Sequence, residues 1–214
     1  MTRWVVGSVL FLAMSLVATG CSGEEPRRGE SPEIWAACDD FFGAENVNAL
    51  DRQMGEGVLR IDSRLASVDE VAKWMASLAL DWEPGSTAHW VNRATPCEIG
   101  LSDTRQQLSS AVSWSNSSIE DLESGKQPRS WRSVGGNVFA YEEANRGTLV
   151  AAFPCKVPGT DKQQEAGLPM EVRISGRGIP GFKDHLRGKL ASALARTMSS
   201  ALKCVNAPVI PSEL

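Results

Sequence analysis

The sequence has very few of the residues from which catalytic and metal sites are usually built. It holds only two histidines, His89 and His185, a single tyrosine and no C-x-x-C pair. A serine triad needs a nucleophile, a base and a group that orients the base, and no G-x-S-x-G motif supplies the nucleophile. Zinc and thioredoxin-like redox sites both need closely spaced cysteines. We therefore expect no metal site, no cofactor and no catalytic residue.

The chain also lacks an excess of positive charge. It has 22 Lys and Arg against 26 Asp and Glu, which gives a formal net charge of −4. A protein that binds nucleic acid needs a basic face to neutralise phosphates, so we expect no nucleic-acid partner. No G-x-x-x-x-G-K-[ST] loop is present, and we interpret Gly135-Gly136 and Gly176-Arg177-Gly178 as turns.

Long apolar runs are missing except at the N-terminus. There, Arg3 precedes the apolar stretch 4–17, which is shorter than the roughly 20 residues of a membrane-spanning helix. The small residues 18–20 and then Cys21 follow, a pattern typical of a cleaved secretory signal. This segment resembles the lipobox of bacterial lipoproteins, with alanine at position 18 where leucine is usual. The resemblance implies that Cys21 carries a thioether-linked diacylglycerol.

These features predict three parts of the chain. Residues 1–20 are expected to be a cleaved lipoprotein signal peptide, residues 21–33 a lipidated tether without packing side chains, and residues 34–214 one globular domain. A single acyl chain binds a protein to a membrane only reversibly, whereas two or three chains anchor it stably. The expected location is extracytoplasmic, at the cell membrane. The alternative is a plain secretory signal, with Cys21 as a spare thiol.

The other four cysteines predict two disulfides in an exported domain. Four cysteines allow three connectivities, and the sequence alone does not decide between them. We favour the pairing of neighbours along the chain, which joins Cys38 to Cys97 and Cys155 to Cys204.

Hydrophobic periodicity predicts an α+β fold. Near the N-terminus we expect two short helices, one over 44–54 that ends at Gly55, and one that begins with a capping box from Ser67 to Glu70. A helix of about 20 residues is expected after Pro180, with apolar residues every four positions from Phe182. Between them, alternating polarity predicts an antiparallel sheet of about five or six strands that this helix covers. The expected strands lie near 58–61, 97–101, 108–115, 134–141, 148–155 and 170–175.

Three short motifs carry a resemblance that spans most of the mature chain. They are Trp35-Ala36-Ala37-Cys38, Pro96-Cys97-Glu98-Ile99 and Leu202-Lys203-Cys204. Together they resemble a loose set of actinobacterial exported lipoproteins of uncharacterised function. The resemblance implies a location and a fold class, and it implies no reaction.

Six tryptophans remain after the signal segment, and they fall into two groups. Three lie on predicted apolar faces and are expected in the core: Trp35, Trp74 and Trp114. The other three lie near the ends of elements and form a possible ligand surface: Trp82, Trp90 and Trp131. Aromatic rings there suit stacking against a sugar or a peptide. The alternative is partial burial at the rim of the core.

The hypothesis we favour is a non-catalytic envelope lipoprotein, held at the membrane by its lipid, that binds a partner protein or a small ligand. One alternative is an anchored hydrolase whose carboxylate pair comes from distant elements, since such a pair is invisible in the sequence. Another is a purely structural module of the envelope.

Overall fold

The computed structural model describes residues 32–60, 66–86, 92–125, 130–143, 147–183 and 185–214. The predicted signal peptide, Cys21, Trp90 and His89 lie outside the described residues. The first element, α1 (Pro32–Phe42), includes the last two residues of the expected tether. No helix among the described segments is long and apolar enough to span a bilayer.

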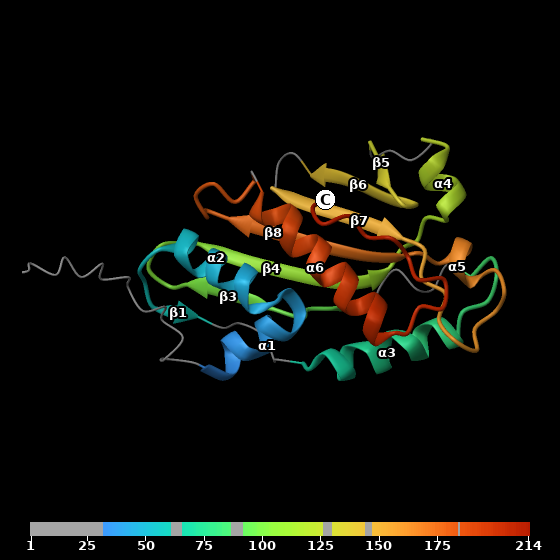
Figure 1. The fold of residues 1–214 in the computed structure, drawn as a ribbon, viewed down its shortest axis with the longest axis horizontal. Coiled ribbons are helices and arrows are strands. Elements are labelled where there is room, and N and C mark those ends of the chain that lie inside the picture. Colours follow the sequence, from blue (N-terminus) through green and yellow to red (C-terminus); the bar gives the residue numbers. More distant parts are fainter. Residues whose placement is uncertain (1–31, 61–65, 87–91, 126–129, 144–146, 184) are drawn as a thin grey trace, which may run out of the picture.

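The centre of the molecule is an eight-stranded sheet in which every pairing is antiparallel. Its order is β1-β3-β4-β8-β7-β6-β5, and β2 pairs with β4 in line with β3 (Figure 1). The predicted α+β class is confirmed. The sheet has two more strands than the upper expectation, because the two-residue strand β2 was not predicted and the expected strand 134–141 is divided into β5 and β6. The strands are β1 (Leu59–Arg60), β2 (Arg93–Ala94), β3 (Glu98–Leu101), β4 (Gln107–Trp114), β5 (Arg132–Gly135), β6 (Val138–Glu143), β7 (Thr148–Phe153) and β8 (Met170–Arg177).

The helices form one layer on one side of this sheet. The long C-terminal helix α6 (Leu186–Ala201) packs on β8 and β7, and α1, α2 (Ala44–Met54) and α3 (Val68–Leu80) pack beside it (Figure 1). Two short helices lie elsewhere, α4 (Ile119–Glu123) and α5 (Gln164–Gly167). The predicted capping box is confirmed, since the Glu70 backbone N–H donates to the Ser67 hydroxyl and the Ser67 backbone N–H donates to the Glu70 carboxylate.

The core lies between the helix layer and the sheet. Apolar side chains from α1, α2, α3 and α6 meet the inner-facing residues of β3, β4, β7 and β8 in one cluster. Trp114 at the end of β4 is 2% exposed, and its indole N–H donates to the backbone carbonyl of Met75 in α3 at 2.9 Å. The largest fully buried side chains of the chain belong to this cluster; among them are Trp35, Trp114, Phe41, Phe42 and Phe153.

Two disulfides join the layers at separate places. Cys38 of α1 bonds to Cys97 just before β3, and Cys155 just after β7 bonds to Cys204 beyond α6. The predicted pairing is confirmed. Disulfides persist in oxidising environments, so the protein belongs to an extracytoplasmic compartment.

Some boundaries differ from the predictions. The helix α1 differs from the expectation of two N-terminal helices, because its apolar residues form a short run that fits a helix or a strand equally well. The expected strand 134–141 is two strands, since a turn at Gly136-Asn137, both with positive φ, reverses the chain between β5 and β6. The last helix begins at Leu186 rather than Phe182, which lies in the preceding turn and is buried.

Trp74 is the one tryptophan that was expected in the core and is not buried. Its side chain is 36% exposed on α3, whereas Met75 beside it is fully buried. A helix position beside a buried one turns by about 100°, so Trp74 lies at the edge of the apolar stripe.

Candidate functional site

The polar face of the sheet, on the side opposite the helix layer, carries the candidate site. Along β4 the side chains alternate: Leu108, Val112 and Trp114 belong to the core, while Ser109 and Ala111 face the other way. The same alternation along β8 sends Val172 and Ile174 to the core and the intervening residues outward. The view in Figure 1 looks onto the helix layer, so this polar face lies behind the sheet.

A hollow of about 720 Å³ occupies the middle of this face. We call it the sheet hollow. Its lining is polar almost throughout, and it comes from six strands and the residues beside them: Arg93, Thr95, Glu98, Gln107, Ser109, Ser110, Ala111, Glu143, Thr148, Arg173, Ser175 and Arg177.

The floor of the sheet hollow is a row of small side chains that the strand register places side by side. Thr148 of β7 pairs with Ser175 of β8, which pairs with Ser109 of β4. The row ends at a glutamate on each side, Glu143 on β6 and Glu98 on β3. Small residues in the centre and long ones at the ends make the surface concave. The Thr148 hydroxyl donates to the Ser175 hydroxyl at 3.1 Å.

Arg173 is the centre of a hydrogen-bonded network beside this row. Its Nε donates to Glu171 Oε1 at 2.7 Å, and its Nη1 donates to Glu143 Oε1 at 2.9 Å. Its Nη2 donates to the Tyr141 hydroxyl at 3.2 Å. Burial by itself lowers the pKa of Arg173, but the charge of Glu171, the nearby Tyr141 and the hydrogen bonds to both glutamates outweigh burial and raise this pKa. Arg173 is therefore a fixed positive charge.

Two further arginines stand at opposite ends of the sheet hollow. Arg177 pairs with Gln107 at one end of β4, and Arg93 pairs with Ser113 at the other. Both arginines are exposed, and neither side chain makes a hydrogen bond or ion pair with another described residue. The side-chain amide of Gln107 donates to Glu98. No described residue therefore occupies the guanidinium groups of Arg93 and Arg177, which makes them candidate ligand contacts.

The structure brings two carboxylates close together, as the hydrolase hypothesis requires. Glu143 and Glu171 both accept hydrogen bonds from Arg173, which limits the separation of their Oε1 atoms to about 8 Å. The two catalytic carboxyl groups of glycosidases lie about 5–9.5 Å apart, so this separation is compatible with such a pair. However, each of these oxygens accepts a hydrogen bond from the guanidinium of Arg173. An acid catalyst must instead carry a proton and donate it to the substrate.

The three tryptophans of the predicted ligand surface do not form one platform. Trp82 is buried in the main core, where a side chain at Gly167 would meet its ring at 2.7 Å, so the prediction of an exposed ring is wrong for this residue. Trp131 is half-buried and packs edge to face against Tyr141, with ring centroids 4.4 Å apart. Through Tyr141, it lies next to the Arg173 network. Trp90 is outside the described residues.

The remaining motifs form no site. The side chain of His185 is 78% exposed, and its Nδ1 lies 2.7 Å from Glu213 Oε1. Gly176, Gly178 and Gly181 match G-x-G-x-x-G, which the interpretation as a turn had passed over. They follow an antiparallel strand, and α6 begins five residues later, whereas a dinucleotide site needs a parallel strand leading directly into a helix. In the described segments no three His, Cys, Asp or Glu side chains gather as metal ligands.

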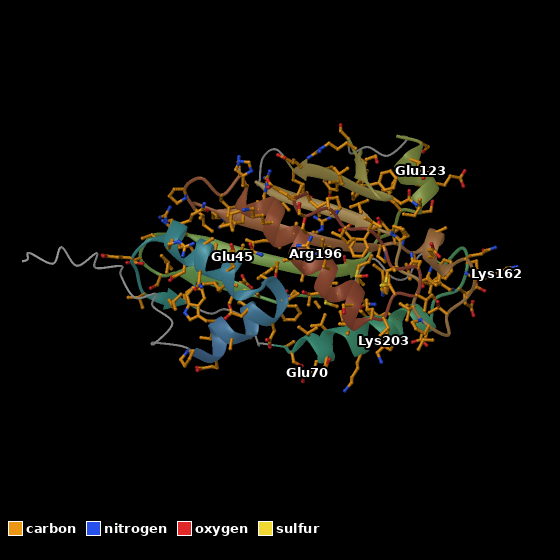
Figure 2. All side chains as sticks on the ribbon, viewed as in Figure 1. Glu45, Glu70, Glu123, Lys162, Arg196 and Lys203 are labelled. Carbon is orange, nitrogen blue, oxygen red and sulfur yellow. A yellow bond between two sulfur atoms is a disulfide. The ribbon has the colours of Figure 1, made fainter. Side chains whose placement is uncertain are left out.

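A second hollow, of about 290 Å³, lies on the helix side between the end of α6 and the chain beyond it. Arg196 and Lys203 line it, and Figure 2 shows both on this side of the molecule. The Arg196 guanidinium already donates to the carbonyl of Pro211 at 2.8 Å. This hollow is less than half the size of the sheet hollow, and fewer of its charged groups are available.

The sequence contained part of the signal for the sheet hollow. The alternation along β4 indicated one apolar and one small polar face, but it did not indicate which strands lie beside it. The row from Glu98 to Glu143 joins segments 45 positions apart, and only the register reveals it. No protein-family model, no curated protein and no solved structure matches this chain.

Proposed function

We propose that this protein is a lipid-anchored extracytoplasmic lipoprotein that binds a partner protein or a small ligand of the cell envelope and catalyses no reaction. The observation that carries the proposal is the sheet hollow, a concave polar surface of about 720 Å³ with an exposed arginine at each end whose side chain bonds to no other described residue. A polar sheet face that served only solubility would not need a floor of small residues between long ones. The hollow is therefore the binding surface.

The arrangement of charged groups supports binding over catalysis. A general acid or base must exchange a proton with the substrate, and it must be free to do so. Glu143 and Glu171 are both occupied by Arg173, and Glu98 accepts from the Gln107 amide. These groups hold one another in place, which suits a preorganised binding surface.

The location rests on two supports of different kinds. The disulfides Cys38–Cys97 and Cys155–Cys204 require an oxidising compartment for the folded domain. The membrane anchor rests on the lipobox-like segment that ends at Cys21. The first described helix begins at Pro32, eleven positions after Cys21, and a chain of that length spans at most roughly 40 Å. The hollow therefore works close to the membrane surface.

The anchor is tested by mass spectrometry of the protein from native membranes. We expect a mature chain that begins at Cys21 and carries the mass of a diacylglyceryl group. The variant Cys21→Ser should leave the membrane fraction while keeping both disulfides. A bare Cys21 in the native protein would refute the anchor and leave the binding proposal standing.

The binding surface is tested by proximity cross-linking of the full anchored protein in its native membrane. Ser109→Phe places a ring on the floor of the sheet hollow, and we expect it to abolish the capture of specific partners. Ser133→Phe is the matched control, because Ser133 is an exposed strand residue outside the hollow. Equal capture by Ser109→Phe and the natural protein would refute this surface.

The second candidate function is the anchored hydrolase, favoured only by the closeness of Glu143 and Glu171. It is tested with a panel of chromogenic glycosides and the isosteric variant Glu143→Gln. Turnover that the natural protein shows and Glu143→Gln loses would establish it and refute the non-catalytic proposal.

A further inference from the structure

We infer that the sheet hollow binds a short neutral saccharide. This inference rests on the proposed function, because it names the ligand class of the same surface. It is argued from the charge balance, the chemistry of the floor and the size of the hollow.

The charges of the described residues in and next to the sheet hollow balance. Three arginines line it, Arg93, Arg173 and Arg177, together with Glu98 and Glu143, and a third carboxylate, Glu171, is hydrogen-bonded to Arg173 outside the lining. A receptor for an anion or a cation needs an excess of the opposite sign, since like charges at the site oppose the ligand. A surface with equal numbers of both signs favours a ligand without net charge.

The floor of the hollow matches a ligand rich in hydroxyl groups. Each hydroxyl of a saccharide both donates and accepts hydrogen bonds, and so do Ser109, Ser175 and Thr148. Around them, arginine and amide groups donate while carboxylates accept. Sites for lipids and aromatic ligands are lined mainly by apolar side chains, whereas among the described lining residues only Ala111 is apolar.

The size of the hollow limits the length of the saccharide. A volume of about 720 Å³ falls within the usual range of small-molecule sites. We estimate that it holds roughly two to four sugar residues.

An aromatic pair stands beside the hollow where a longer saccharide would reach it. Tyr141 is linked to the lining by its hydroxyl, which bonds Glu143 and Arg173. Trp131 packs against Tyr141 and remains half-exposed. The C–H face of a sugar ring stacks well on an aromatic ring. The inference therefore joins Trp131, one residue of the predicted ligand surface, to the residues of the hollow.

The test is calorimetry on the mature, oxidised domain with neutral tetrasaccharides of glucose, mannose, galactose and N-acetylglucosamine, and with tetragalacturonate as the acidic counterpart. We expect at least one neutral probe to bind. Its affinity should change less than about twofold between 50 and 500 mM NaCl, since screening does not act on an uncharged ligand.

The site is tested with the same variants as before and one more. Ser109→Phe should weaken binding more than about tenfold by filling the floor, while Ser133→Phe should change it less than about twofold. If Ser109→Phe fails to fold, the double variant Arg177→Gln/Glu98→Gln tests instead whether the saccharide binds in the hollow. It removes one charge of each sign and so leaves the net charge unchanged. We expect it to weaken binding about threefold to tenfold.

The outcomes separate this inference from the proposed function. Binding of tetragalacturonate alone, with a steep loss in salt, would overturn the neutral saccharide. Failure of every saccharide would also overturn it, yet the proposed function would stand if Ser109→Phe still abolished the capture of partners in the membrane. If Ser109→Phe changed neither saccharide binding nor capture, both would fall.

Discussion

The two faces of strands β4 and β8 differ in chemistry although their residues alternate along the same backbone. The face toward α6 presents Leu108, Val112 and Ile174, all fully buried. The opposite face presents Ser109 and Ser175, which line the sheet hollow. Burial of apolar surface provides most of the stability of a domain, so the first face holds the fold together. The second face contributes little apolar burial at its centre and is available for binding.

A substitution on the face toward α6 should lower the free energy of unfolding more than one on the polar face. Trp114→Ala removes a buried ring and its hydrogen bond to Met75, and we expect the free energy of unfolding to fall by about 3–5 kcal/mol. Chemical denaturation of the oxidised domain measures it. A loss below about 1 kcal/mol would show that the core does not depend on this face.

Arg173 would break a strict division between the faces, because it lies on the polar face yet should matter for stability. Arg173→Met leaves the buried Glu171 carboxylate without its ion-pair partner, and we expect the free energy of unfolding to fall by about 2–3 kcal/mol. The raised pKa of Arg173 means that its contribution is present in full below the ordinary arginine pKa and is lost only at still higher pH. The loss should therefore be equal at pH 6 and pH 9. A marked difference between these values would contradict this assignment.

Two neighbouring serines sharpen the comparison most directly. Ser110 is 1% exposed, and its hydroxyl accepts from the Cys97 N–H and donates to the Cys97 carbonyl. Ser110→Ala removes both hydrogen bonds and should lower the free energy of unfolding by about 1–2 kcal/mol. Thermal unfolding of the oxidised protein detects a change of this size.

Ser109→Ala is the smallest of the four effects on stability. Ser109 faces the hollow and makes no hydrogen bond to another described residue through its hydroxyl. We expect Ser109→Ala to change the free energy of unfolding by less than about 0.5 kcal/mol. If Ser109→Ala proved as harmful as Ser110→Ala, the polar face would be part of the structural core.

Periodicity was enough to predict the elements that have a strong pattern. The helix α2 ends where Gly55, with a φ of 66°, interrupts it, and α3 begins with the predicted box at Ser67. The segment at Asn137 is different. Gly135-Gly136 was interpreted as a turn, yet one strand was expected across it, and the positive φ values of Gly136 and Asn137 show that the chain reverses there between β5 and β6. The helix α1 was missed since its short apolar run does not distinguish helix from strand.

The candidate site was less predictable than the fold because it depends on contacts between distant segments. Trp131 was singled out for its position near the end of an element, and that reasoning applied equally to the buried Trp82. Arg173 was not predicted as a site residue, since an arginine in a strand of alternating polarity usually faces solvent. Glu171 lies two positions before Arg173 on the same strand, whereas Glu143 comes from β6, and only the register of β6, β7 and β8 brings it to Arg173.

The positions of the two cross-links have a mechanical consequence for a protein pulled by its ends. Tension applied before Cys38 passes directly to Cys97, and the stretch between them, 59 positions long, bears no load. The same holds over the 49 positions from Cys155 to Cys204, which include β8 and α6. Only the segment between Cys97 and Cys155 and the short ends can lengthen. Reduction should therefore release on the order of 350 Å of extra extension in single-molecule stretching.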